Sequence, residues 1–172
     1  MKRLKIVPFA LLLMAMAMAI SISMPSSAAL TDTPGSSTRP RPSVALEPQH
    51  VVRIVIDALA TNDEPYANAG IETTFAFASP ANKVNTGPLD RFTRMVKGST
   101  YGIMVDHASS EFSQVVYVEN RAYQMVRLTS PQGRAVVFAF RLSKQLDGEF
   151  KDMWMTDAVW PVAEDDVTQQ GF

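Results

Sequence analysis

The sequence contains no cysteine, and this absence excludes several kinds of protein at once. Without thiols there is no disulfide framework, no lipid-anchored cysteine, no thiolate metal site and no cysteine nucleophile. The fold must therefore depend on its hydrophobic core, and apolar residues make up 47% of the chain against 19% charged residues. A length of 172 residues indicates one domain with appendages.

Histidine is also scarce, since His50 and His107 are the two in the chain. No His–x3–His spacing and no convergent set of carboxylates is present, so we expect no metal site. The sequence has no Gly-rich phosphate loop, no nucleophile elbow and no recognisable Ser/His/Asp arrangement. These absences argue against hydrolase and nucleotide chemistry, and no cofactor is expected.

Positive charge is not in excess, with 16 Lys and Arg against 17 Asp and Glu. Without the first thirty residues the balance becomes more acidic, because Lys2, Arg3 and Lys5 are lost and no acid is lost with them. The remaining 13 basic and 17 acidic residues give a formal charge of −4. Such a domain lacks the basic surface that neutralises phosphates, so nucleic acid is not an expected partner.

The N-terminus has the layout of a secretory signal peptide. Positive charges within residues 2–5 precede an almost wholly apolar stretch over residues 6–22, and Pro25 then precedes small residues at 26–29. We therefore predict a signal peptide over residues 1–29, with cleavage after Ala28 or Ala29. The alternative is an uncleaved membrane anchor, because the apolar stretch is close to the ~17 residues that span a bilayer.

Pro8 and the small residues that follow the apolar stretch favour cleavage over anchoring. The chain has no twin-Arg pair in this region, which favours the general secretory route. We expect the protein in the periplasm or secreted, with the thylakoid lumen as the alternative because its signals are similar. Contact with a membrane is expected only through the signal peptide.

Composition divides the rest of the chain into three parts. Residues 30–46 are rich in proline, serine and threonine and have little to bury, which indicates a disordered linker. Residues 47–162 contain the periodic apolar patterns of a folded domain. Residues 163–172 are polar and acidic, which indicates a flexible tail.

The first half of the domain has helical periodicity. After Pro48, apolar residues recur on one face and predict a helix that ends near Ala60: Val51, Val52, Val55, Ile56 and Leu59. A second, shorter helix is predicted over residues 69–77, with Ser79-Pro80 as its end, because the residue before a proline is pushed out of the α conformation. A third helix begins at Gly87-Pro88 and ends at Gly98.

Beyond Gly102 the apolar pattern changes to period two, which predicts strands. The predicted strands cover residues 111–118, 121–129, 136–142 and 150–162. Asp147-Gly148 indicates a tight hairpin before the last strand, since such turns need positive φ angles. The connections are too short for crossover helices, so we expect an antiparallel meander. Three helices followed by four antiparallel strands are typical of the α+β class.

This arrangement resembles the cone-shaped fold of nuclear-transport-factor-2-like (SnoaL-like or cystatin-like) proteins, in which helices pack on a curved antiparallel sheet. Three strings sharpen the resemblance: residues 75–82 (FAFASPAN), residues 86–89 (TGPL) and, after Asp147-Gly148, residues 154–157 (WMTD). With Phe92 and Met95-Val96, they are similar to an exported or organellar family, domain of unknown function 4864. The resemblance implies a fold with a cavity between sheet and helices, and no established activity or catalytic residues.

Two candidates for acid–base chemistry precede the strands. His107 follows Asp106, and a carboxylate there could orient the imidazole as a general base. The alternative, which we favour, is an exposed loop histidine. Tyr101 could donate to an oxyanion, although no tyrosine lies on the first helix as in the cone-fold isomerase. The alternative for Tyr101 is ordinary half-buried packing.

A third candidate, Asp157, is expected on an apolar face of the last strand, shared with Met153, Met155 and Val159. A carboxylate on such a face could act as an acid or a base. Trp154 should point the other way, so that it and Asp157 could line one cavity only if the strand contained a bulge. The alternative is that Asp157 pairs with Arg127 or Arg141, or faces solvent.

The sequence leaves three functions open. The leading hypothesis is a non-catalytic binding or interaction module whose cavity takes a small apolar ligand, or whose partner is a protein or a second copy bound through the sheet. The second is an isomerase or dehydratase that uses Asp157, His107 and Tyr101. The third is a structural or accessory envelope protein whose cavity is filled by its own Phe, Met and Trp side chains.

Overall fold

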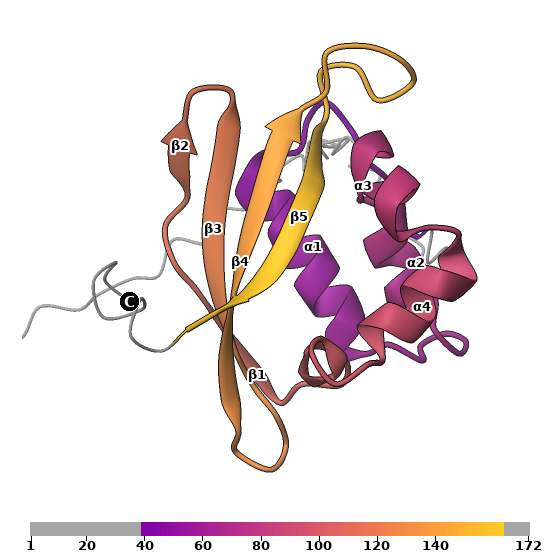
Figure 1. Cartoon of the computed structure of the whole chain (residues 1–172), viewed down its shortest axis with the longest axis vertical. Coiled ribbons are helices and arrows are strands. Elements are labelled where there is room, and N and C mark those ends of the chain that lie inside the picture. Colours follow the sequence, from indigo (N-terminus) through magenta and orange to yellow (C-terminus); the bar gives the residue numbers. More distant parts are fainter. Residues whose placement is uncertain (1–38, 164–172) are drawn as a thin grey trace, which may run out of the picture. The chain divides into compact units, whose positions relative to one another are not determined.

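The computed structural model describes residues 39–163, and Figure 1 shows the elements in this range. Four α-helices come first: α1 (Pro48–Ala60), α2 (Ala69–Ala76), α3 (Pro80–Thr86) and α4 (Leu89–Val96). A 3₁₀ helix, η1 (Gly102–Met104), leads into five strands: β1 (Ser109–Phe112), β2 (Val116–Val118), β3 (Arg121–Thr129), β4 (Ala135–Lys144) and β5 (Trp154–Val162). The predicted signal peptide, the first part of the predicted linker and almost all of the predicted tail lie outside the described residues.

The strands form one antiparallel sheet with the order β1-β3-β4-β5, and β2 also pairs with β3. The α+β class and the antiparallel pairing are thus confirmed. Residues 39–163 contain four α-helices and five strands instead of the expected three helices and four strands. Within residues 39–163, none of the helices has the length and apolar character that a bilayer-spanning helix needs.

The extra strand arises because the predicted strand 111–118 is interrupted. Phe112 pairs with Val126 and Val116 pairs with Tyr123, so three residues of one segment stand opposite two of β3. At the interruption the Ser113 hydroxyl accepts the Met125 amide at 3.0 Å, in the place of a main-chain carbonyl. A serine side chain that replaces a ladder acceptor lets the chain bulge without leaving a buried amide unpaired.

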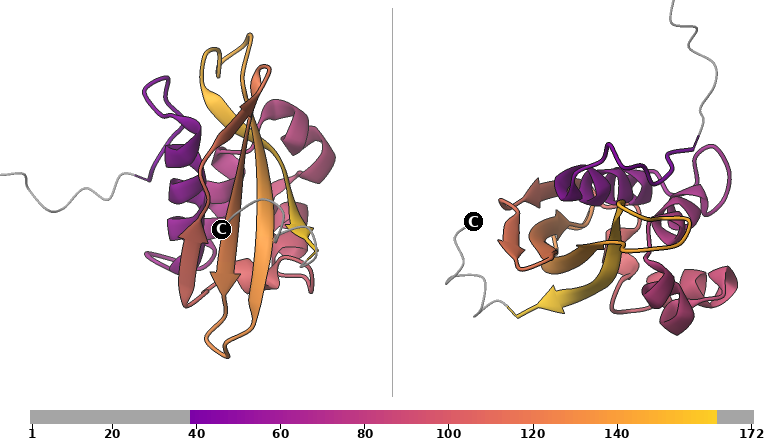
Figure 2. Two further views of the ribbon diagram at one scale, coloured as in Figure 1. Left: turned by 90° about the vertical axis from the view of Figure 1, so that its left-hand side faces the viewer. Right: turned by 90° about the horizontal axis from the view of Figure 1, so that it is seen from above.

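The core lies between α1 and the sheet. The α1 residues predicted to face inward are all buried, and so are the inward residues Phe138, Phe140 and Leu142 of β4, which confirms both apolar patterns. Figures 1 and 2 show α1 along one face of the sheet, with α2, α3 and α4 beside it toward the β5 edge. This placement leaves β5 as the strand that meets the helices both at its face and at its edge.

The approach of α2 to α1 requires a glycine at position 70. A Cβ on Gly70 would lie 2.0 Å from the Ala58 carbonyl oxygen, which no side chain can tolerate. The loop between the helices is held by buried Asn62, whose carbonyl accepts the Gly70 amide and whose side-chain oxygen accepts the Ile71 amide at 3.1 Å. A buried side chain thus provides the acceptors that the first turn of α2 needs.

The additional helix, α3, corrects the expected role of Ser79-Pro80. The α-helix before it ends at Ala76, and Ser79-Pro80 begins α3. Ser79 is extended and its hydroxyl accepts the Asn82 amide at 3.2 Å, while Pro80 occupies the first helical turn. The restriction that proline places on the preceding residue is also the conformation that an N-cap requires, so the same pair can start a helix.

The connection from β4 to β5 is longer than the expected tight hairpin. Gly148 has the predicted positive φ of 69°, but the loop closes at Gln145, whose amide donates to the Met153 carbonyl at 2.9 Å and whose carbonyl accepts the Asp152 amide at 2.8 Å. Residues 145–153 therefore form a loop, and β5 begins at Trp154 rather than at Phe150. The Asp-Gly pair turns the chain inside that loop rather than between the strands.

We expect Phe138→Ala to lower the free energy of unfolding by about 3–5 kcal/mol, because it removes a fully buried ring from the core. Urea unfolding followed by circular dichroism measures the loss. Val84→Ala on α3 is the control, since Val84 is 82% exposed and its truncation should change stability by less than about 0.5 kcal/mol. Equal losses in the two variants would contradict the placement of the core.

Candidate functional site

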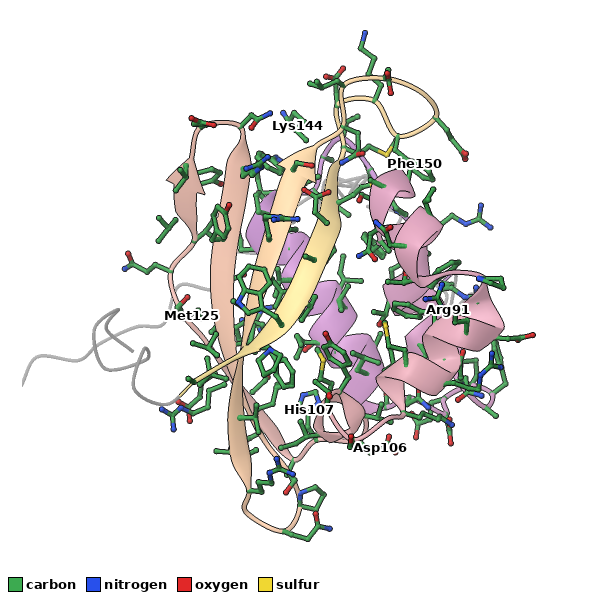
Figure 3. The ribbon with its side chains drawn as sticks, in the orientation of Figure 1. Arg91, Asp106, His107, Met125, Lys144 and Phe150 are labelled. Atoms are coloured by element: carbon green, nitrogen blue, oxygen red, sulfur yellow. The ribbon has the colours of Figure 1, made fainter. Side chains whose placement is uncertain are left out.

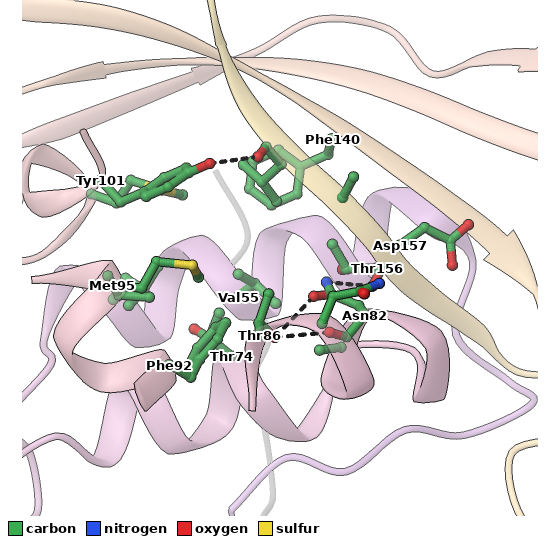
Figure 4. A pocket seen from close by; sticks show the side chains of 17 residues that line it. Val55, Thr74, Asn82, Thr86, Phe92, Met95, Tyr101, Phe140, Thr156 and Asp157 are labelled. Atoms are coloured by element: carbon green, nitrogen blue, oxygen red, sulfur yellow. Dashed lines mark hydrogen bonds between the residues drawn. The ribbon is translucent and has the colours of Figure 1, made fainter. Parts of the chain in front are cut away.

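A cavity of about 210 Å³ lies between the sheet and the helices (Figure 4). Its walls come from every helix and from both C-terminal strands, with Val55 of α1, Phe92 and Met95 of α4, and Phe140 of β4 among the apolar contributors. The cavity is mostly apolar and larger than the ~150 Å³ apolar cavity that accommodates benzene in an engineered protein. It is thus large enough for a small molecule and not filled by the surrounding Phe and Met side chains.

Most polar groups in the cavity wall already have partners inside the protein. The Thr74 hydroxyl donates to the Gly70 carbonyl at 2.9 Å, and the Thr86 hydroxyl donates to the Asn82 carbonyl at 2.9 Å. The Asn82 amide nitrogen donates to the Thr156 carbonyl at 3.0 Å and so joins α3 to β5. Because these donors already form hydrogen bonds with helix and strand carbonyls, they are not available to a ligand.

Thr156 is the exception. Its amide donates to Phe77 and its carbonyl accepts the Ser79 amide, both at 2.9 Å, so its main chain is fully engaged. Its side chain is different: the residue is only 5% exposed, and its hydroxyl oxygen has no hydrogen-bond partner within residues 39–163. A buried hydroxyl without a partner costs about 1–3 kcal/mol, and the residue that carries this one is part of the cavity wall.

The β5 wall is attached to the helical side at two points. The segment Phe77–Ser79 pairs with Thr156 through the two main-chain bonds above, as a one-residue parallel bridge at Ala78. Three residues further on, the Tyr101 hydroxyl donates to the Val159 carbonyl at 3.1 Å. Between these attachments lie Asp157 and Ala158, and both line the cavity.

Asp157 occupies a β-bulge, which sequence periodicity could not anticipate. Leu142 pairs with Thr156 whereas Arg141 pairs with Ala158, so Asp157 is the extra residue on β5. The bulge places Thr156 and Val159 opposite the inward residues Leu142 and Phe140, while Met155 pairs with Ser143. The expectation that Asp157 shares one apolar face with Met155 and Val159 is therefore wrong.

The Asp157 carboxylate is directed away from the other labelled side chains of the cavity (Figure 4). No ion pair joins it to Arg141 within residues 39–163. Strand β5 does contain the bulge that would let Trp154 and Asp157 share a cavity. Trp154 is nevertheless not part of the cavity wall, and its ring packs edge-on against Tyr117. Asp157 thus belongs to the cavity wall, but its carboxylate is directed away from the other side chains there.

The structure does not bring His107 to this cavity. Its Nδ1 donates to the Met104 carbonyl at 2.9 Å. The residue is buried, so the prediction of an exposed loop histidine is wrong. The Asp106 carboxylate accepts the Asn62 amide at 3.4 Å instead of orienting the imidazole. Both residues close the junction between η1 and the end of α1, where Figure 3 shows them.

Tyr101 does line the cavity, where it is half-buried and its ring stacks on Phe138 at a centroid distance of 6.1 Å. Its hydroxyl proton is committed to the Val159 carbonyl, so the oxyanion donor that the sequence suggested already has an internal acceptor. The oxygen itself can still accept a hydrogen bond. Of the three candidates, the cavity wall therefore contains Tyr101 and Asp157, the latter with its carboxylate directed away, and lacks His107.

Lys83 fixes the position of α3 from outside the cavity. Burial lowers the pKa of its ammonium below the ordinary 10.5, while the carboxylate of Glu149 acts in the opposite direction. Nζ donates to the Ala76 carbonyl at 3.1 Å and lies 4.9 Å from the centroid of the Phe150 ring. These contacts join α3 to the end of α2 and to the loop 145–153. No group of three or more metal-ligating side chains exists within the described range.

Several residues of the cavity wall fall in the strings that carried the resemblance. Ala78 and Asn82 lie in residues 75–82, Thr86 begins residues 86–89, and Thr156 lies in residues 154–157. In the sequence, the first two strings predict where helices end and begin, and nothing there singles out Asn82, Thr86 or Thr156 as site residues. Their convergence on one cavity was the available signal, and it depends on the unpredicted helix α3.

Comparison with known proteins gives one match. The profile of a protein family described as a domain of unknown function (DUF4864) covers residues 46–166. No curated protein and no solved structure matches the chain.

We expect Tyr101→Phe to lower the free energy of unfolding by about 0.5–1.5 kcal/mol, because the Val159 carbonyl loses its donor while the ring remains. Thermal and urea unfolding measure the change. Tyr66→Phe is the matched control: its hydroxyl donates to Glu72 on the exposed surface, and its loss should change stability by less than about 0.5 kcal/mol. A Tyr101→Phe protein as stable as the control would show that this attachment does not hold β5.

Proposed function

The chain belongs to the DUF4864 family, a domain of unknown function, and we propose that this domain binds a small molecule in the cavity between its sheet and its helices. The observation that carries the proposal is a concave, mainly apolar space of about 210 Å³ that persists although Phe92, Met95 and Phe140 surround it. Small-molecule sites are concave and mostly apolar, with few polar groups that fix orientation.

The arrangement supports binding more than acid–base catalysis. A general acid and a general base must both reach the reacting atoms in the cavity. Here the Tyr101 proton is held by Val159, the Asp157 carboxylate is directed away, and His107 is bonded to Met104 elsewhere. A purely structural domain would be expected to fill such a space with its own side chains, since protein interiors are close-packed.

The cone-like, nuclear-transport-factor-2-like arrangement belongs to the same proposal. Its support is the helix α1 packed across the face of an antiparallel sheet, with a cavity bounded by the shorter helices and β5. In such an arrangement the ligand would enter between the helices and the last strand. Met95 of α4 lies there, lines the cavity and is 37% exposed, which places it at an opening.

We expect a thermal-shift screen of the purified protein against small neutral molecules to give saturable stabilisation, about 2.7 kcal/mol at a hundredfold excess over Kd. Val55→Phe should abolish this response, because it adds a ring to the floor of the cavity. Val84→Phe, the same change at an exposed position of α3, should retain it. A flat screen with folded, monodisperse protein would refute small-molecule binding.

Export is the second part of the proposal, and it is supported by the charged, apolar and small-residue order of residues 1–29. When the full chain is expressed in a bacterium, the envelope fraction should contain a shortened protein. N-terminal sequencing should then find a first residue of Ala29 or Leu30. A full-length chain retained in the cytoplasm would contradict processing, and a full-length chain in the membrane would favour the anchor.

A further inference from the structure

We propose that the ligand is a small neutral molecule with an apolar body and one hydrogen-bonding group, a hydroxyl or a carbonyl, that pairs with the Thr156 hydroxyl. This inference rests on the proposed function and specifies the chemistry of the same cavity. The space of about 210 Å³ limits the body to roughly one ring or a short branched chain, by comparison with the ~150 Å³ cavity that holds benzene.

Neutrality follows from the charges around the cavity. No Lys, Arg or His lies in its wall, and the carboxylate of Asp157 points away from it. A buried ion without a partner of opposite charge is strongly disfavoured, so anionic and cationic molecules of the same size should be rejected. The remaining wall is built from aliphatic, aromatic and neutral polar side chains.

The polar group of the ligand is placed by Thr156. Thr156 is at least nine-tenths buried and lines the cavity, and its hydroxyl lacks a partner, whereas the neighbouring Thr74 and Thr86 hydroxyls donate to helix carbonyls. A hydroxyl both donates and accepts, so either a hydroxyl or a carbonyl of the ligand can pair with it.

The arrangement of the cavity wall in Figure 4 indicates how the ligand would be oriented. In Figure 4, Thr156 and Asn82 lie at one end of the cavity, and Phe92, Met95 and Tyr101 lie at the other. The polar group therefore sits beneath α3, and the apolar body extends toward α4 and η1. The Tyr101 oxygen, whose proton is held by Val159, can accept a second weak polar contact at the far end.

Phenol, toluene and benzoate test this chemistry, because they have similar size and differ in the group on the ring. Titration calorimetry of the whole protein with each probe measures affinity. We expect Thr156→Val to weaken phenol by about three- to tenfold and not to weaken toluene. Thr73→Val is the matched control and should leave both affinities within about twofold, since this buried threonine donates to the Ala69 carbonyl and lies outside the cavity wall. Benzoate should show no saturable binding.

The variant without any probe gives a second measurement. Because the Thr156 hydroxyl has no internal partner, Thr156→Val should be at least as stable as the native protein in urea unfolding. A marked loss of stability would show that the hydroxyl serves the fold, and would overturn the inference.

The outcomes separate the two proposals. In one outcome, Val55→Phe abolishes the binding of both toluene and phenol, but Thr156→Val does not weaken phenol relative to toluene. This result would refute the role of Thr156 and leave the binding function standing. Saturable binding of benzoate, or a screen in which every hit is charged, would refute neutrality alone. Absence of binding by both neutral probes, together with a flat screen, would remove both proposals.

Discussion

The attachment of β5 to the helical segment before α3 is the constraint on which the rest of the domain depends. Two main-chain hydrogen bonds of 2.9 Å join Thr156 to Phe77 and Ser79, and the Asn82 side chain adds a third bond to the same residue. Helix α2 is also packed on α1, but α3 is a helix of seven residues, marginal alone, and these bonds hold its N-terminal side against the strand. The cavity exists because these bonds hold the helices at a fixed distance from the strand.

That attachment also explains why the cavity is not closed by packing. Helix α1 fills the space against β3 and β4 with branched side chains, and the core there is dense. Strand β5 also packs on this core through Val159, and its edge is held in addition by backbone and side-chain hydrogen bonds. The bulge at Asp157 interrupts the regular register of the strand between its two attachments. A space between rigidly held walls then remains for a ligand.

The sequence predicted the elements whose pattern is long and whose partners are simple. Helix α1 and strand β3 have the expected limits, and the inward face of β4 is the predicted one. Five periodic apolar residues specify α1 and four specify β4, while turn residues bound β3. It failed where one residue changes the register. Ser113 splits a strand through its side chain, and Asp157 adds a residue to β5; neither leaves a trace in apolar periodicity. The site was not predicted for a related reason: Ser79-Pro80 predicts a helix end because proline restricts its neighbour, and that restriction serves an N-cap equally well. The three strings were visible, but their meeting at one cavity depends on helix α3.

The two edges of the sheet differ in a way that bears on association between copies. An exposed strand edge is a template for another strand, and a sheet with two open edges can extend without limit. In this domain the β5 edge is occupied at Thr156 and at Val159 by groups of the same chain, while β1 and β2 form the other edge. Copies that join through β1 and β2 would therefore find the other edge blocked at these two residues, which disfavours the growth of a paired assembly into a fibre.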